Sequence, residues 1–401
     1  MLNNMKSTKC LDILCFFHLG GIVMKVELKK TVKDVLQDGL AKASMFAKKN
    51  TQLPILKGIL FRVSKTEITI IGSTRNEIYS YSIPVDENII IHSEGELVLP
   101  INIEEIIKRL KKDIMLEQNE SKMCISSGSS RFVLNCLNPD EYPFRNDLQN
   151  NNAQLNLNTR ELSSDLAKVV FAASKSDARP ILKGVALQAK DGYLTLQSTD
   201  SYRLGYCNKA ISMDQEFKFI FPAEEISNAF KKLFNESNDI EIYLNSELNK
   251  VIFKNGFITY SVSMIVGEYP DLERLLPSDF STEIKFNRKE LIKAIELLKP
   301  IVMDAHEEKK GILRLKVAND QLELSSYQTQ AGNGKVAVSF SELIGETNLE
   351  LAVSMTYILD ALKEGLEGEE IWFKSAGSNK PFILSSEEFE EHLQLVLPVR
   401  S

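Results

Sequence analysis

Carboxylates are plentiful in this sequence, and several stand in neighbouring pairs that could do acid–base chemistry, among them Glu104-Glu105, Glu224-Glu225 and Glu387-Glu388. Two carboxylates held close together can act as general acid and general base in one reaction. Each pair, however, stands at the expected start of a helix or in a charged turn. There a carboxylate stabilises the positive end of the helix dipole or faces water. The positions therefore favour a structural role for all three pairs.

The sequence contains no short motif of the common catalytic classes. It lacks the GxxxxGK[ST] phosphate-binding loop, the HExxH zinc motif and the GxSxG nucleophile turn. Its four histidines, His18, His92, His306 and His392, lie in separate regions without the spacing of metal ligands. We therefore expect no catalytic residue, no metal site and no cofactor, and a protein that is not an enzyme.

The five cysteines form no CxxC pair and leave one over: Cys10, Cys15, Cys124, Cys136 and Cys207. This pattern is typical of reduced thiols in a cytoplasmic protein. A disulfide between Cys124 and Cys136 is the alternative.

The chain is acidic, with a formal net charge of −7, so its surface as a whole does not suit nucleic acid. Basic residues nevertheless gather on segments with helical spacing: Lys48, Lys49, Lys108, Arg109, Lys111, Lys112, Lys168, Lys175, Lys231, Lys232 and Lys293. A weakly basic helix face can hold duplex DNA by its phosphates without reading bases. The alternative is that lysines near helix ends only complement the helix dipole.

A repeat runs through the chain. The letters PILKG occur at 54–58 and 180–184, and a further Lys-Gly pair stands at 310–311, so that the three glycines lie 126 and 127 residues apart. Glu-Tyr-Pro occurs at 141–143 and again at 268–270, and Pro398 follows at a similar interval. Two markers that keep one phase indicate that a single domain is present three times.

Each repeat contains alternating, strand-like segments and two stretches of helical spacing. The expected helices span residues 32–49, 102–113, 159–175, 223–233, 288–298 and 354–366. The pattern predicts an α+β fold with two helices on an antiparallel sheet in every domain. We expect the domains at residues 24–148, 152–278 and 280–401, with joints near 148–154 and 276–283. Repetition also argues against an enzyme, because an active site is seldom needed three times.

Residues 1–23 differ from the rest of the chain. The apolar stretch from Leu11 to Met24 contains Asp12 and His18, is too short to cross a bilayer and has no small-x-small cleavage site. We expect this extension to lie outside the fold and translation to begin at Met24.

Five segments resemble the signature segments of the bacterial DNA sliding clamp, the β subunit of the replicative DNA polymerase III: LPILKGI, RPILKGV, STDSYRL, GEYPDLERLLP and LVLPVR. The resemblance runs from Met24 to Ser401 and implies three tandem DNA-clamp domains that form a ring as a head-to-tail homodimer. It implies a processivity factor that encircles duplex DNA and works in the cytoplasm at the nucleoid, without a membrane. The implied partners are the replicative polymerase, the clamp loader, repair polymerases and mismatch-repair factors.

The resemblance also assigns roles to residues. It implies a partner-peptide pocket made of Leu182, Thr199, Ser201, Tyr202, Arg203, Leu204, Pro270, Arg274, Leu275, Leu395, Val396, Leu397, Pro398, Val399 and Arg400. It implies DNA contacts from Lys48, Lys49, Arg109, Lys112 and Arg179. It implies a dimer interface made of Arg131, Phe132, Leu134, Ile301 and Val302. From the residues alone, the alternative for Leu182, Leu204, Phe132 and Leu134 is ordinary core packing.

Some positions depart from the family pattern. Thr74-Arg75 stands where the family usually has Thr-Asp, and Ala223-Glu224-Glu225 stands where a basic residue commonly faces DNA. A second hypothesis is therefore a degenerate clamp paralogue that acts as a partner-binding module, in repair or in replication of another replicon.

Overall fold

The computed structural model describes residues 23–48, 53–143, 155–213, 215–234, 238–303, 311–318, 320–326 and 332–399. By its internal contacts the chain divides into two compact units, the first ending at Arg145 and the second beginning at Asn146. No helix among the described residues is both long enough and apolar enough to span a membrane. Residues 1–22, with most of the expected N-terminal extension, lie outside the described part, and β1 begins at Met24.

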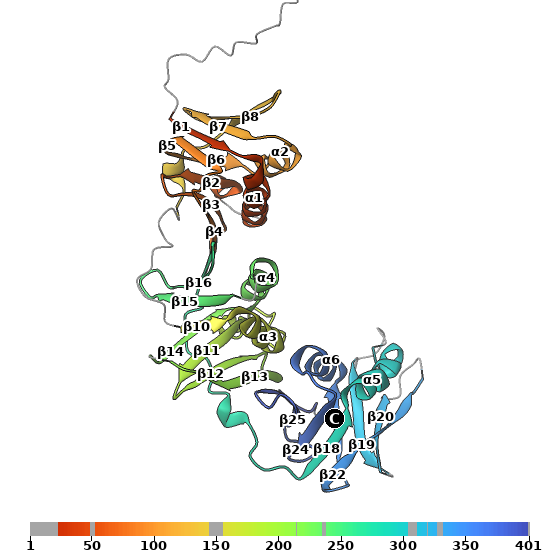
Figure 1. Ribbon diagram of the computed structural model, residues 1–401. Helices are drawn as coiled ribbons and strands as arrows, with labels where there is room; N and C mark the ends of the chain where they lie inside the picture. The colour runs from red at the N-terminus through yellow and green to blue at the C-terminus, as the bar shows by residue number, and fades with distance from the viewer. Residues whose placement is uncertain are drawn as a thin grey trace, which may run out of the picture. The chain divides into compact units, whose positions relative to one another are not determined.

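The first unit consists of two antiparallel sheets with two helices on one face (Figure 1). Its elements are β1 (Met24–Leu28), α1 (Lys33–Ala47), β2 (Gly58–Val63), β3 (Glu67–Ser73), β4 (Glu77–Pro84), β5 (Ile89–Ser93), β6 (Gly95–Pro100), α2 (Ile103–Arg109), β7 (Ile114–Asn119), β8 (Lys122–Ser127) and β9 (Ser130–Asn135). One sheet has the strand order β5-β1-β7-β8-β9, and the other contains β4-β3-β2-β6.

Helix α1 packs its apolar face on β3 and β4. Its residues Leu36, Leu40 and Ala43 are at most 1 % exposed, and burying one leucine side chain stabilises a fold by about 1.5–3 kcal/mol. Gly72 on β3 permits this close approach, because a Cβ there would lie 2.2 Å from the carbonyl oxygen of Ala43. A side chain at position 72 would therefore push the helix off the sheet.

The second unit contains two further sets of sheet and helix. The elements of the first set are β10 (Leu155–Asn158), α3 (Thr159–Val170), η4 (Pro180–Lys183), β11 (Gly184–Lys190), β12 (Tyr193–Thr199), β13 (Arg203–Ala210), β14 (Phe217–Pro222), α4 (Ala223–Leu233), β15 (Asp239–Asn245), β16 (Lys250–Asn255), β17 (Ile258–Ser263) and η5 (Glu273–Leu275). Those of the second set are β18 (Thr282–Asn287), α5 (Arg288–Val302), β19 (Ile312–Ala318), β20 (Gln321–Ser326), β21 (Lys335–Ser339), β22 (Glu342–Gly345), β23 (Glu350–Ser354), α6 (Met355–Asp360), η6 (Ala361–Gly365), β24 (Glu370–Ser375), β25 (Phe382–Ser386) and β26 (His392–Val396).

The two sets share one sheet. Strand β26 pairs with β13 in antiparallel register, from Arg203 opposite Val396 to Cys207 opposite His392. The resulting nine strands follow the order β14-β11-β12-β13-β26-β25-β24-β18-β22. The last strand of the chain is therefore held at the middle of a sheet and joins the second and third domains.

The markers that repeat in the sequence meet in space. In the first domain the hydroxyls of Tyr142 and Ser73 lie 2.8 Å apart. In the second domain the Tyr269 hydroxyl accepts a hydrogen bond from the Thr199 amide and donates one to the Gly184 carbonyl. Both tyrosines are 2 % exposed, and burial raises the pKa of Tyr142 to about 12. The Glu-Tyr-Pro marker keeps its phase because in both domains its tyrosine makes a buried contact with the end of a strand, at Ser73 in the first domain and at Thr199 in the second.

Three predicted helix starts are confirmed by side-chain caps. Asn158 accepts hydrogen bonds from the amides of Arg160 and Glu161, Asn287 caps α5 and Ser354 caps α6. Such a cap stabilises a helix by about 1 kcal/mol. The glutamate pairs at 104–105 and 224–225 lie in the first turns of α2 and α4, as expected.

Several predicted helix ends were wrong. Helix α2 ends at Arg109 because Leu110 takes an extended conformation, and α3 ends at Val170. Helix α5 continues past the predicted end at 298 to Val302, with Pro300 inside it. The predicted helix 354–366 is α6 followed by the π-helical turn η6.

The disulfide alternative was also wrong. Cys124 and Cys136 are both free and buried, as is Cys207. The described chain thus places three of the five thiols in its core.

Candidate partner-binding groove

An apolar cavity of about 530 Å³ opens between the second domain and the C-terminal strand. Its lining residues are Arg179, Ile181, Leu182, Thr199, Ser201, Tyr202, Arg203, Leu204, Pro270, Leu272, Leu275, Pro381, Leu395 and Leu397. We call this cavity the groove. Most of its lining is aliphatic, which suits a short peptide with aliphatic or aromatic anchors.

Four segments far apart in the sequence build the walls of the groove. Leu182 comes from η4, Leu204 from β13, Leu272 from the turn before η5, and Leu395 from β26. These four leucines are at most 4 % exposed and belong to one core cluster. They form a fixed apolar floor, because they are packed together before any ligand arrives.

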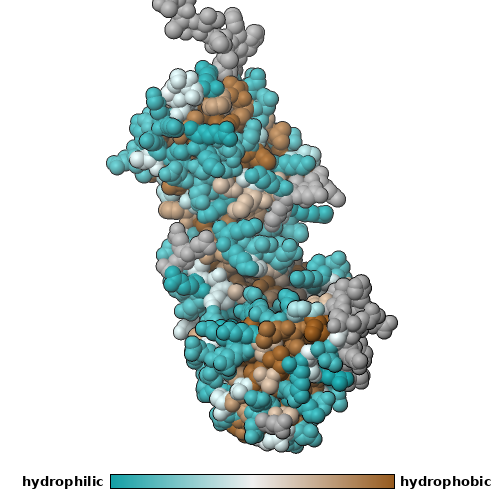
Figure 2. All heavy atoms as spheres, turned by 90° about the vertical axis from the view of Figure 1, so that its right-hand side faces the viewer, coloured by the Kyte–Doolittle hydropathy of each residue, from teal (hydrophilic) through white to brown (hydrophobic). Residues whose placement is uncertain are grey.

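The rim of the groove exposes further apolar surface. Tyr202 is 61 % exposed and Leu275 is 55 % exposed, although both line the cavity. Large exposed apolar side chains that border a cavity are typical of an interaction site. Figure 2 shows that hydrophilic side chains cover most of one face of the molecule and that apolar side chains gather in only a few places.

Arg203 joins the groove to the third domain. Its guanidinium contacts Asp200 at 3.0 Å and Asp360 at 2.6 Å and donates to the Phe171 carbonyl. It also lies 4.6 Å from the centre of the Tyr357 ring. The guanidinium is thus occupied by the protein itself, and we assign Arg203 to positioning the groove rather than to contacting a ligand.

The turn before β13 is tight. Ser201 has a φ of 81°, a left-handed conformation that is unfavourable for serine. The Thr199 hydroxyl stabilises the turn, because it accepts from the Ser201 amide and donates to the Arg203 carbonyl. This turn presents Ser201 and Tyr202 at the rim.

The C-terminal segment is held on two sides. The Leu397 amide donates to the Tyr202 carbonyl at 2.9 Å, and the Val399 amide donates to the Ala352 carbonyl at 2.7 Å. The first bond continues the pairing of β26 with β13, and the second ties the segment to β23; together they hold Leu395 and Leu397 in the groove. The apolar run at the C-terminus is therefore part of the folded structure.

The structure brings ten residues of the expected peptide pocket together around the groove: Leu182, Thr199, Ser201, Tyr202, Arg203, Leu204, Pro270, Leu275, Leu395 and Leu397. Val396 alternates to the other face of β26 and is 1 % exposed in the third-domain core. Arg274 pairs with Asp271 at 2.8 Å on the surface, Pro398 and Val399 lie beyond the groove, and Arg400 lies outside the described residues.

Four groove residues were not expected there: Arg179, Ile181, Leu272 and Pro381. Ile181 lies in the PILKG segment and Leu272 in the EYPDL segment. Both stand close to residues that were expected in the pocket, so the sequence could have predicted them. Arg179, expected at DNA, donates to the Ser201 hydroxyl at 3.4 Å at the groove edge. Pro381 comes from the turn before β25 and carries no sequence signal.

The other expected DNA contacts lie in the first unit. Lys48 follows α1 and approaches Glu104 at 4.0 Å, Arg109 is 79 % exposed and pairs with Glu105 at 3.2 Å, and Lys112 is exposed. Lys49 lies outside the described residues.

One of the helix lysines is not available for DNA. Lys168 on α3 is 5 % exposed and its ammonium lies 3.3 Å from Glu367. Its expected place on a basic surface was wrong, because the third domain covers it.

The expected dimer residues lie on β9 of the first unit and on α5 of the second. Arg131 and Phe132 are exposed on β9, the edge strand of its sheet, while Leu134 is 8 % exposed. Ile301 and Val302 lie at the end of α5, where Ile301 is half-buried and Val302 belongs to the core. An edge strand with an exposed aromatic side chain is suited to pairing with another chain.

One cluster has the residue types of a metal site. The ligand atoms of Asp165, Cys207 and His392 lie within 4.8 Å of one another and are all buried. The Lys209 ammonium, however, lies 2.5 Å from Asp165, and burial raises the pKa of the Cys207 thiol, which keeps it protonated. The cluster therefore fits a buried ion pair better than a metal.

Comparisons with known proteins agree with this geometry. Family models of the DNA polymerase III beta subunit match residues 27–146 (N-terminal domain), 156–271 (central domain) and 273–400 (C-terminal domain). The beta sliding clamps of Staphylococcus epidermidis and Staphylococcus aureus are 32 % identical over 359 residues, which cover 88 % of this chain and 93 % of theirs.

Solved structures give the same result. The crystal structure of the DNA polymerase sliding clamp from Bacillus subtilis matches with a TM-score of 0.86 and 30 % identity, over 94 % of this chain and all of that one. The beta chain of DNA polymerase III from Streptococcus pneumoniae is 23 % identical over 94 % of this chain and all of that one. Its TM-score of 0.86 supports the same fold. The fold is that of a three-domain DNA clamp. The chain belongs to the DNA polymerase III beta subunit family, the bacterial sliding clamps.

Proposed function

We propose that this protein is a DNA polymerase processivity factor without enzymatic activity. Two chains close head to tail into a ring that encircles duplex DNA, slides along it and tethers partners through the groove. The observation that carries the proposal is the groove itself, since a preformed apolar cavity at a joint between domains is combined with the three-domain fold of the family.

Retention on DNA in such a ring comes from topology, so strong binding is unnecessary. A few exposed basic residues such as Arg109 and Lys112 can touch phosphates while the chain keeps a net charge of −7. Duplex DNA presents a negative charge about every 1.7 Å along its axis, so weak contacts are available at every position. Weak and equivalent contacts permit sliding. Lys48, Lys49 and Arg179 stay proposed contacts of the same kind.

The groove serves several partners in turn. A small apolar floor with an exposed rim binds one or two anchor side chains, which gives modest affinity and easy exchange. We infer that the replicative polymerase, the clamp loader, repair polymerases and mismatch-repair factors compete for it in the cytoplasm, at the nucleoid.

For the homodimer we propose that β9, with Arg131, Phe132 and Leu134, meets the end of α5 around Ile301 and Val302 of a second chain. The exposed edge of β9 supports this assignment.

A loading experiment tests the proposal. The protein is loaded onto nicked circular DNA by a clamp loader, washed in high salt, and the DNA is then linearised. A ring stays on the circle through the wash and leaves the linear form. A degenerate paralogue that keeps only the groove would bind a partner peptide but would not survive the wash on circular DNA.

A further inference from the structure

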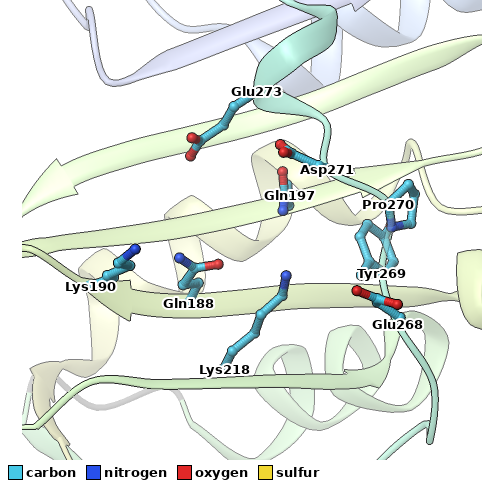
Figure 3. Close-up of a pocket in the computed structure, with 9 residues that line it drawn as sticks. All are labelled: Gln188, Lys190, Gln197, Lys218, Glu268, Tyr269, Pro270, Asp271 and Glu273. Atoms are coloured by element: carbon cyan, nitrogen blue, oxygen red, sulfur yellow. The ribbon is translucent and has the colours of Figure 1, made fainter.

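A second cavity, of about 540 Å³, adjoins the groove and shares Pro270 with it. Its other lining residues are polar or charged apart from Tyr269: Gln188, Lys190, Gln197, Lys218, Glu268, Asp271 and Glu273 (Figure 3). We call this cavity the polar pocket. A peptide whose anchors lie in the groove can reach it without leaving the surface of the second domain.

Two layers form the polar pocket. The floor is one face of the sheet, where Gln188 on β11 pairs with Lys218 on β14, and Gln197 lies on β12. The roof is the segment 268–273, which contributes three carboxylates. Tyr269 fixes this roof to the sheet by its hydrogen bonds with Thr199 and Gly184. The pocket is therefore a built feature and not a gap under a loose loop.

Gln197 is the residue that points to a ligand. Its side chain is 5 % exposed, and its Oε1 atom has no hydrogen-bond partner among the described residues. In Figure 3 the amide of Gln197 points toward Asp271, within the pocket. Buried acceptors are almost always paired in folded proteins, so the pocket lacks a donor.

The carboxylates of the roof can complete the site. Asp271 is contacted by Arg274 through one oxygen only, and Glu273 accepts one hydrogen bond, from the Tyr206 hydroxyl at 3.3 Å. Each carboxylate keeps a second oxygen that has no partner in the described structure. These oxygens and the Gln197 oxygen together form a set of acceptors, which suits a donor-rich cation such as a guanidinium.

We propose that the polar pocket binds a basic side chain, arginine above all, that flanks the apolar anchors of a partner peptide. This inference rests on the proposed function of the groove. The pocket holds three carboxylates and only two ammonium groups, and its buried atom without a partner, the Gln197 Oε1, is an acceptor. An acidic side chain would therefore be repelled there, whereas a basic side chain would find partners. Lys190 and Lys218 lie on the sheet side in Figure 3, away from Glu273.

Peptide affinities test the inference. The full-length protein is titrated with fluorescent synthetic peptides that carry a leucine and a phenylalanine anchor, and arginine, glutamate or glutamine is placed in turn at each flanking position. We expect the peptide with arginine at one of these positions to bind about tenfold more tightly than the peptide with glutamine there, because it adds one charged hydrogen bond. The peptide with glutamate at that position should bind more weakly than the glutamine peptide.

Variants assign the effect to the pocket. The double substitution Asp271→Asn with Glu273→Gln should remove the arginine advantage and leave the affinity of the glutamine peptide unchanged. Lys218→Gln is the matched control, because it removes a charge from the same pocket and should preserve or increase the advantage.

The outcomes separate the two proposals. If the glutamine peptide binds and arginine gives no advantage at any position, or the advantage persists in the double variant, the polar pocket is not a basic-residue site. If no peptide with apolar anchors binds at all, the proposed function of the groove itself fails.

Discussion

Asp165 on α3 and His392 on β26 form a buried hydrogen bond in which Nε2 and Oδ1 lie 3.0 Å apart. The two residues are 227 positions apart in the chain and belong to different domains. The Lys209 ammonium completes the cluster at 2.5 Å from the second carboxylate oxygen. Beside it, the Gln394 amide donates to the carbonyls of Lys168 and Gly365. The strand that carries Leu395 into the groove is thus anchored by polar contacts with Asp165 and Lys168 of the second domain and with Gly365 of the third.

The first prediction concerns pH. Burial opposes ionisation of Asp165, but the hydrogen bonds from His392 and Lys209 outweigh it and hold the carboxyl pKa below its ordinary value. A lowered pKa in the folded state means that the carboxylate stabilises the fold above the unfolded pKa of about 3.9, and that this stability is lost as the pH falls through the lower folded value. Asp165→Asn should therefore cost about 3 kcal/mol in urea unfolding at neutral pH, and the difference from wild type should shrink below about pH 4.

An exposed pair provides the control for this prediction. Asp177 also has a lowered pKa, through its hydrogen bond with Lys183 at 2.6 Å, but the pair lies in water. Asp177→Asn should change neither the unfolding midpoint nor its pH dependence measurably. An Asp165→Asn protein as stable as wild type at neutral pH would show that the cluster does not stabilise the domain junction.

The second prediction concerns Arg203. Lysine at this position keeps the charge but cannot reach both Asp200 and Asp360 with a planar, forked donor. Arg203→Lys should lower the free energy of unfolding by about 2 kcal/mol. It should also weaken binding of an apolar peptide, because the turn at Asp200 and helix α6 at Asp360 would no longer be linked through one side chain. Circular dichroism during urea unfolding and fluorescence anisotropy of a labelled peptide measure the two effects.

Arg274→Lys is the matched control for Arg203→Lys. Arg274 pairs with one carboxylate only and its side chain is 85 % exposed, so stability should not change. Equal effects of the two substitutions would contradict the positioning role of Arg203.

The sequence predicted the fold well where the information was local or repeated. Three domains followed from the spacing of Gly58, Gly184 and Gly311, and two helices in each domain followed from the helical spacing of apolar residues. Local patterns could not reveal the partners of a helix face, which is why Lys168 was expected on a basic surface although Glu367 and the third domain bury it.

The groove was predictable only where its residues lie in short segments that could be recognised in the sequence. Its leucines lie in segments that resemble the family, whereas Val396 was misplaced because strand alternation turns every second residue to the other face. Pro381 and the Asp165–His392 bond depend on chain segments that meet only in the folded protein. No spacing in the sequence could have indicated them.

The third prediction concerns the C-terminus. Deleting residues 397–401 removes Leu397 from the groove and the hydrogen bonds of the Leu397 and Val399 amides with Tyr202 and Ala352. We expect peptide affinity to fall by at least about tenfold, while light scattering still gives the mass of two chains. Leu397→Ala should reproduce most of the loss and Val399→Ala little of it, since only Leu397 lines the groove. Unchanged affinity in the deletion variant would refute the assignment of the groove.

The fourth prediction concerns the dimer. Phe132 is 38 % exposed on an edge strand, so a polar residue there should not unfold the domain, but it would remove an apolar contact from the proposed interface. Phe132→Ser should shift the mass in solution from two chains toward one as the protein is diluted, with an unchanged unfolding midpoint for the separate chain. Tyr193→Ser is the control, because Tyr193 is 50 % exposed on β12 in the second domain, outside the proposed interface, and should leave the mass at two chains. Should Phe132→Ser remain fully dimeric at the lowest concentration at which the wild type is dimeric, the β9 edge would not be the contact that closes the ring.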